Sequence, residues 1–187
     1  MKNLHLKIFS LVVICIMSAS TVFAYQTLAF DFPSNSGSWM VVYHRNINNE
    51  TIVQYVPRGQ TFENWNQAFI IHSYRNSQQQ SAVNLLRVLT RQLEIMNNYS
   101  RYIYQTASAD DAVATRCVVR NDRMPSQCDI YRAMTSFNGY ITIQYINRDV
   151  EGFKDTYFNW LDAIKKARPY YSEFRNDRYM SKDNFEL

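Results

Sequence analysis

The sequence predicts an α+β fold, in which an antiparallel sheet of about six to seven strands is flanked by helices as an α/β/α sandwich. Several segments alternate apolar and polar residues, with the period of two that is typical of a strand with one face in the core. A tight turn at Asn138-Gly139 joins two of these segments, which makes their pairing antiparallel. Two other segments place apolar residues three and four apart, as amphipathic helices covering a sheet do.

The first structured element is expected after an N-terminal arm. Residues 25–37 are a short segment of mixed composition that ends in the turn formers Pro33, Ser34, Asn35, Ser36 and Gly37. We interpret them as a loosely attached arm that precedes a single domain at 38–172. Trp39 to His44 and Thr51 to Val56 alternate in the strand period, and Pro57 ends the second segment. Together they predict a β-hairpin.

A short helix and a strand follow. Thr61 can cap a helix that carries Phe62 and Trp65 at helical spacing. From 68 to 74 the content of β-branched and aromatic residues rises, which favours a strand, and one longer helix reaching Tyr74 is the alternative. The main helix is predicted between 81 and 98, with its buried stripe at Ala82, Leu85, Leu86, Leu89, Leu93 and Met96.

Four strands and a last helix complete the domain. Tyr102 to Ala107 predicts one strand, and the stretch from Asp111 to Asn147 predicts three more in succession. Asp155 is expected to cap the last helix, which would bury Tyr157, Trp160, Leu161 and Ile164. Trp65 and Trp160 would then anchor the two short helical segments on the sheet. The polar tail at 173–187 either packs as a strap or lacks fixed structure.

Cys117 and Cys128 flank a loop from Arg120 to Gln127 and would face each other if the strands on either side pair. A disulfide and two separate thiols are both compatible with this spacing. The compartment favours the disulfide, because an even number of cysteines in an exported chain is typical of disulfide pairing.

Export is indicated by residues 1–24, which have the pattern of a secretory signal peptide. Lys2 and Lys7 precede an apolar run that ends in small residues at Ala24. A membrane anchor would need about 20 apolar residues, and a lipoprotein site at Cys15 is opposed by the bulky Ile14 before it. We therefore expect a periplasmic or extracellular protein with no transmembrane segment after cleavage.

The charge of the secreted form is low. Two lysines and no acidic residue leave with the signal peptide, so the net charge falls from +4 to +2. A strongly basic nucleic-acid-binding protein would retain a larger excess of positive charge. Nucleic acid is therefore not expected as a partner.

The order of the elements resembles the Mog1/PsbP-like fold group, whose exported bacterial members carry a tryptophan helix similar to Thr61-Phe62-Glu63-Asn64-Trp65-Asn66. The resemblance implies a non-enzymatic protein that binds other macromolecules. It supplies no catalytic residues.

Catalytic motifs are absent from the sequence. It contains no zinc-type ligand spacing, no G-x-S-x-G elbow and no phosphate-binding glycine loop, so no metal and no cofactor are expected. His44 and His72 remain the only histidines after residue 24. The alternative function is therefore a secreted, nuclease-like hydrolase in which these two histidines perform acid–base cleavage.

The favoured function is a secreted or periplasmic binding protein of a Gram-negative bacterium. Arginine and tyrosine are frequent at binding hot spots, and both recur around the Arg120–Gln127 loop, which a disulfide would hold in place. We expect the partner to be a protein or a cell-envelope component. The predicted binding residues are Arg116, Arg120, Arg123, Tyr131 and Arg132.

Overall fold

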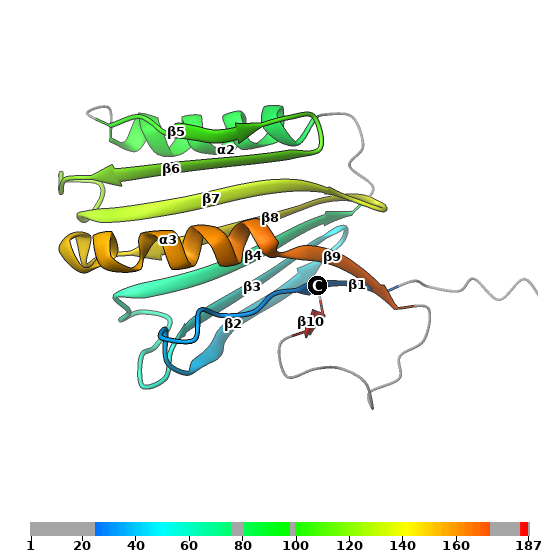
Figure 1. Ribbon diagram of the computed structural model, residues 1–187, viewed down its shortest axis with the longest axis horizontal. Helices are drawn as coiled ribbons and strands as arrows, with labels where there is room; N and C mark the ends of the chain where they lie inside the picture. Colours follow the sequence, from blue (N-terminus) through cyan, green and yellow to red (C-terminus); the bar gives the residue numbers. More distant parts are fainter. Residues whose placement is uncertain (1–24, 76–80, 98–99, 173–183, 187) are drawn as a thin grey trace, which may run out of the picture.

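The computed structural model describes residues 25–75, 81–97, 100–172 and 184–186 (Figure 1). The predicted signal peptide at 1–24 and most of the predicted tail at 173–187 lie outside the described residues. No helix of the described part is long and apolar enough to cross a membrane.

Seven strands of the described chain form one antiparallel sheet in the order β2-β3-β4-β8-β7-β6-β5. The α+β class and the number of strands expected from the sequence are confirmed. The strands are β2 (Trp39–Ile47), β3 (Glu50–Pro57), β4 (Gln67–Arg75), β5 (Ile103–Ala107), β6 (Asp111–Val118), β7 (Gln127–Ser136) and β8 (Gly139–Asn147).

The turn between β7 and β8 lies at the predicted Asn138-Gly139 position. Gly139 has a φ of +145°, which side chains rarely allow. A Cβ atom there would also collide with the carbonyl oxygen of Tyr74 in the neighbouring strand β4. Glycine is therefore required at this turn for two independent reasons.

The two helices cover opposite faces of the sheet. Helix α2 (Ala82–Met96) packs on β6 and β7, whereas α3 (Val150–Lys166) packs on β7 and β8 (Figure 1). Alternation along β7 supplies both faces, since Ile130 belongs to the α3 core and Tyr131 to the α2 core.

The core under α3 is large and aromatic. Trp160 is only 1% exposed, and its ring stacks on Tyr145 with 3.8 Å between the ring centroids. The core under α2 is smaller because the strands contribute alanines to it. Its buried residues are Ala82, Leu86, Tyr102, Ala112, Ala114, Tyr131 and Ala133.

Helix α2 begins at Ala82, within the predicted range of 81–98. Ser81 is its N-cap, and the Ser81 hydroxyl accepts a hydrogen bond from the backbone N–H of Asn84 at 3.3 Å. Its buried stripe is turned slightly from the predicted one. Ala82 and Leu86 are buried together with Thr90, whereas Met96 is 41% exposed.

The predicted helix after Thr61 is wrong. The Thr61 hydroxyl does accept a hydrogen bond from the N–H of Asn64, at 3.1 Å, but the chain makes bends there and enters β4 at Gln67. The strand predicted at 68–74 is confirmed and the longer helix is excluded. Trp65 is consequently a half-buried loop residue whose ring lies under the guanidinium of Arg148, 3.7 Å away, and it anchors no helix.

Helix α3 begins earlier than predicted. Asp149 is its N-cap and accepts a hydrogen bond from the N–H of Gly152 at 3.0 Å, so Asp155 lies inside the helix. Both residues are acidic and precede an apolar run, and the sequence offered no simple way to choose between them. The predicted burial of Trp160, Leu161 and Ile164 is confirmed, and Phe153 joins them.

The N-terminal segment is part of the core, contrary to the expectation of a loose arm. Strand β1 (Tyr25–Ala29) pairs with β9 (Arg168–Ser172) and β10 (Asn184–Glu186) in a small second sheet. Leu28 and Phe30 are buried, and the ring centroid of Phe30 lies 4.3 Å from that of Phe69. The turn-forming residues at 33–37 favoured the interpretation as an arm. Leu28 and Phe30, which precede them, nevertheless fill the α3 core.

Candidate binding site

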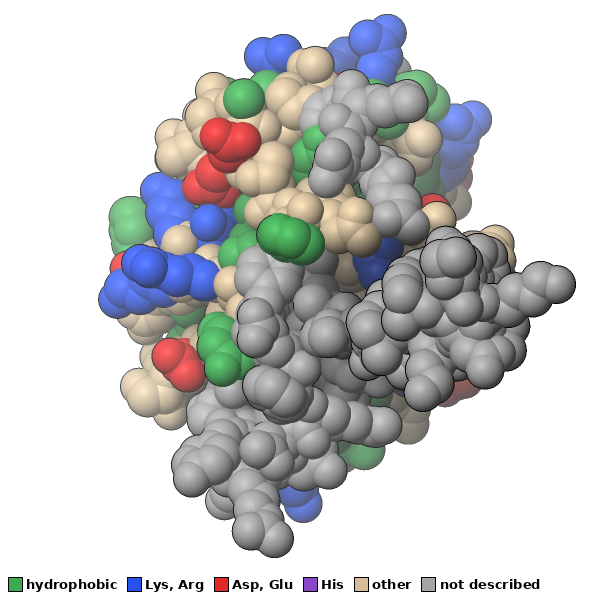
Figure 2. Space-filling view, turned by 90° about the vertical axis from the view of Figure 1, so that its right-hand side faces the viewer, with side chains coloured by type: hydrophobic (Ala, Val, Ile, Leu, Met, Phe, Trp, Pro, Cys, Tyr) green, Lys and Arg blue, Asp and Glu red, His purple; other side chains and the backbone are tan. Residues whose placement is uncertain are grey.

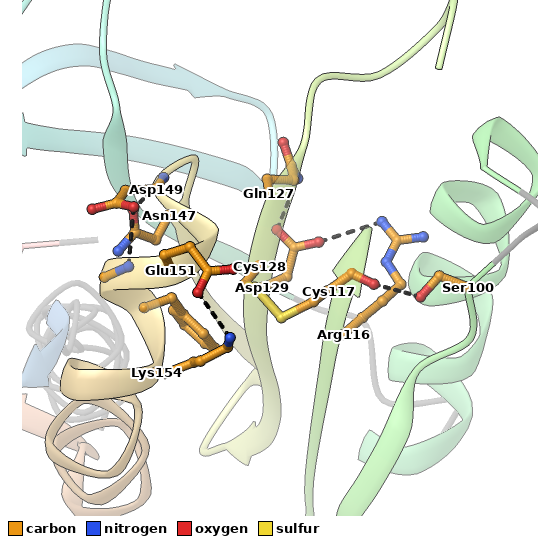
Figure 3. The surroundings of a disulfide bond; sticks show 12 residues. Ser100, Arg116, Cys117, Gln127, Cys128, Asp129, Asn147, Asp149, Glu151 and Lys154 are labelled. Carbon is orange, nitrogen blue, oxygen red and sulfur yellow. Dashed lines mark hydrogen bonds and ion pairs between the residues drawn. A yellow bond between two sulfur atoms is a disulfide. The ribbon is translucent and has the colours of Figure 1, made fainter. Parts of the chain in front are cut away.

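The predicted binding residue Arg116 is buried, with an exposed fraction of 3%. Its Nη2 atom lies 3.3 Å from Oδ2 of Asp129, and its guanidinium carbon lies 4.5 Å from the centre of the Tyr102 ring. Figure 3 shows the guanidinium directed at Asp129 beside the disulfide. Arg116 is thus half of a buried ion pair and cannot contact a partner.

The carboxylate of Asp129 also accepts hydrogen bonds from two other side chains. The Gln127 side-chain amide donates to it at 2.8 Å and the Tyr102 hydroxyl at 3.1 Å. Burial raises the pKa of the Asp129 carboxyl, and Arg116 opposes this shift. Burial also raises the pKa of Tyr102, and the neighbouring Asp129 carboxylate adds to that shift. This polar network connects β6 and β7 beside the disulfide, at the loop end of their hairpin.

Arg132 and Tyr131 are also unavailable as contact residues. Arg132 Nε donates to Asp111 at 2.7 Å, and Nη1 donates to the carbonyls of Ile164 and Ala167. A cation at this place complements the negative end of the α3 dipole. Tyr131 is buried under α2, and burial raises its pKa to about 12.

The disulfide predicted between Cys117 and Cys128 is present, and the two residues lie directly opposite each other on β6 and β7. Of the predicted binding residues, Arg120 and Arg123 are exposed, both on the loop that follows. The hydroxyl of Ser100 donates to the carbonyl of Cys117 at 2.6 Å (Figure 3).

The disulfide loop is attached to the C-terminal end of α2. The side-chain amide of Asn121 donates to the carbonyl of Met96 at 3.0 Å, and that of Asn97 donates to the carbonyl of Val119 at 2.9 Å. The loop, the end of α2 and the start of β5 therefore form one connected region of the surface.

The two histidines of the alternative hypothesis lie on opposite faces of the sheet. His44 is opposite Val53, which belongs to the α3 core, whereas His72 is opposite Ile52 on the other face. His72 Nε2 lies 3.5 Å from Oε2 of Glu50, and burial lowers the pKa of His72. The structure does not bring the pair together. In the described part of the chain, no group of three or more His, Cys, Asp or Glu could hold a metal ion.

A groove between α2 and β5 is the site that sequence reasoning missed. Its volume is about 660 Å³, and it is lined by Arg87, Thr90, Arg91, Glu94, Ile95, Arg101 and Tyr104. Arg87 and Arg91 are one turn apart on the exposed side of α2, a spacing visible in the sequence. Arg101 lies beside them only because of the tertiary fold, which a sequence pattern does not show.

The groove has an excess of positive charge. Its one carboxylate, Glu94, already accepts a hydrogen bond from the N–H of Tyr102 at 2.8 Å and lies 3.8 Å from Arg101. Among the described residues, no carboxylate forms an ion pair with Arg87 or Arg91. The hydroxyls of Thr90 and Tyr104, 3.0 Å apart, are hydrogen-bonded to each other.

Other parts of the surface are less distinctive. A second hollow, of about 620 Å³, lies between the N-terminal segment and α3, but its Lys166 is paired with Asp162 at 2.7 Å. On the side of the molecule seen in Figure 2, described side chains of both charges are interspersed with apolar ones. Charge therefore marks the α2–β5 groove more clearly than either of these regions.

The fold and the groove define an α+β domain with a cationic groove at the edge of its sheet. A protein-family model matches residues 35–173, and the chain belongs to that family, an uncharacterised bacterial family. No curated protein and no solved structure matches the chain.

Proposed function

We propose that this protein is an exported, non-enzymatic binding protein of a Gram-negative bacterium that holds an acidic segment of a partner protein in the α2–β5 groove. The observation that carries the proposal is the groove itself, which is lined by three arginines and by one carboxylate, Glu94, that is already hydrogen-bonded and paired with Arg101. Arginine binds carboxylates through several fixed donors and is frequent at binding hot spots.

Export is supported by the signal-peptide pattern at 1–24 and by the Cys117–Cys128 disulfide, since such bonds persist in oxidising compartments. The resemblance to the Mog1/PsbP-like group, whose members bind other macromolecules, favours the same class of function. The hydrolase alternative gains no support from geometry, because His44 and His72 are on opposite faces.

The groove also has features of a preformed site. The disulfide loop is hydrogen-bonded to the end of α2, which limits movement of the residues around it. Ile95, on the wall of the groove, is 66% exposed and offers apolar contact beside the charges. A partner segment that combines carboxylates with apolar side chains would match both features.

The proposal is tested by charge reversal with a polyglutamate peptide as the probe. The double variant R87E/R91E should bind the labelled peptide about tenfold more weakly than the wild type in fluorescence anisotropy, because each exposed ion pair contributes up to about 1 kcal/mol. The difference should shrink as salt is added.

The matched control is R120E/R123E, which makes the same charge change on the neighbouring loop. It should lower the affinity by less than about threefold, and thermal melts should show that both variants remain folded. A larger loss in the loop variant than in the groove variant would move the site to the loop. Absence of binding by the wild type at low salt would contradict the proposal itself.

A further inference from the structure

Strand β5 is one of the two edges of the seven-stranded sheet. It pairs with β6 and with no other strand in the described part of the chain. The backbone N–H and C=O groups on its outer side are therefore placed to pair with an added strand.

The sequence of β5 lacks side chains that usually protect an edge. Ile103 to Ala107 includes no lysine, no other charge and no proline, and Ile103 is 67% exposed. A register shift between Tyr104 and Thr106 interrupts the ladder to β6, and this irregularity together with the five-residue length of β5 restricts what can pair with the edge. Any added strand would consequently be short, about as long as β5 itself.

The cationic groove runs beside this edge. Tyr104 of β5 and Arg101 just before it line the groove together with Arg87 and Arg91 of α2, and Figure 1 shows α2 and β5 running alongside each other. Residues four apart on a helix are about 6 Å apart along its axis. Alternate residues of a strand are about 6.7 Å apart and point to the same side.

We propose that the partner segment binds by β-strand addition to the outer edge of β5, with acidic residues at alternate positions. This inference rests on the proposed function and deepens it. The acidic side chains lie toward the groove and pair with Arg87, Arg91 and Arg101. The intervening apolar side chains lie on the other side of the added strand.

The test uses a seven-residue peptide of alternating glutamate and valine, and two N-methylated forms of it. One form is methylated at the glutamate nitrogens and the other at the valine nitrogens. An edge strand is bonded on one side only, so one form should bind at least about tenfold more weakly than the other, through loss of two or more hydrogen bonds. Exchange of those amides within 103–107 that are not already bonded to β6 should slow at least about tenfold when the unmodified peptide is bound.

The outcomes separate the two proposals. If the peptide binds in a manner that requires Arg87 and Arg91, yet both methylated forms bind equally well and β5 exchange is unchanged, strand addition is wrong and the groove proposal stands. If R87E/R91E binds the unmodified peptide as well as the wild type does, the groove proposal fails and this inference fails with it.

A peptide with the same composition but four glutamates followed by three valines should bind more weakly than the alternating one.

Discussion

At the scale of single residues, the arginines show how position determines the role of one side-chain type. Arg116 forms a buried ion pair, Arg132 binds the carbonyls at the end of α3, and Arg87 and Arg91 line an exposed groove. The sequence did contain a signal for the first of these. Pairing Cys117 with Cys128 sets the register of β6 and β7, and this register places Arg116 directly opposite Asp129.

Trp160 and Trp65 differ in burial, so substituting them distinguishes a core position from a surface position. Trp160→Ala should lower the free energy of unfolding by about 3–5 kcal/mol, because it removes a fully buried ring that stacks on Tyr145. Trp65→Ala should cost about 1 kcal/mol or less, since it removes a half-exposed ring and one cation–π contact with Arg148. Urea unfolding of the two variants measures both values, and similar losses in the two would contradict this assignment of core and surface.

At the scale of elements, the periodicity of apolar residues predicted strands and helices well, whereas single capping residues predicted the starts of helices poorly. Strands β2, β3, β4 and β8 and the buried stripe of α3 follow from their patterns, because burial on one face imposes a period on the chain. Thr61 and Asp155 were misleading because each has the chemistry of a helix cap. The hydrogen bond from the N–H of Asn64 to Thr61 forms within a loop, so a capping contact does not by itself specify a helix.

The β6–β7 hairpin gives the prediction at this scale. The double variant C117A/C128A should lose about 3 kcal/mol of stability, the value for releasing a closed loop of about a dozen residues in the unfolded chain. Its strands should remain paired in the same register, because the Arg116–Asp129 network and the ladder to β8 are retained. Urea unfolding measures the loss. A midpoint equal to that of the oxidised wild type would show that the bond contributes nothing to stability.

At the scale of the whole molecule, the sequence predicted the class of the fold and one sheet covered on both faces. It could not predict the candidate site, because the groove combines Arg87 and Arg91 of α2 with Arg101, and only the packing of α2 against the sheet edge brings them together. The sequence pattern also placed Arg116, Tyr131 and Arg132 in a binding surface. They are buried because α2 packs on one face of β6 and β7 and α3 packs on the other face of the sheet, and composition carries no information about this packing.

The N-terminal segment completes the hydrophobic core, although it precedes the region that the family model matches. Phe30 stacks on Phe69, and the ring centroid of Phe32 lies 5.2 Å from that of Trp39. A chain beginning at Asn35 should therefore fail to fold stably, because removing several buried side chains at about 3 kcal/mol or more each approaches the total stability of a typical domain.

A point substitution tests the same idea without truncation. Phe30→Ala should destabilise the protein by about 3–5 kcal/mol in urea unfolding. Asp31→Ala, its exposed neighbour, should change the stability by less than about 0.5 kcal/mol. If the chain beginning at Asn35 unfolds with the midpoint of the longer chain, the segment is a loose arm after all. The domain would then be the 38–172 unit that the sequence pattern indicates, because the core under α3 would be complete without Leu28 and Phe30.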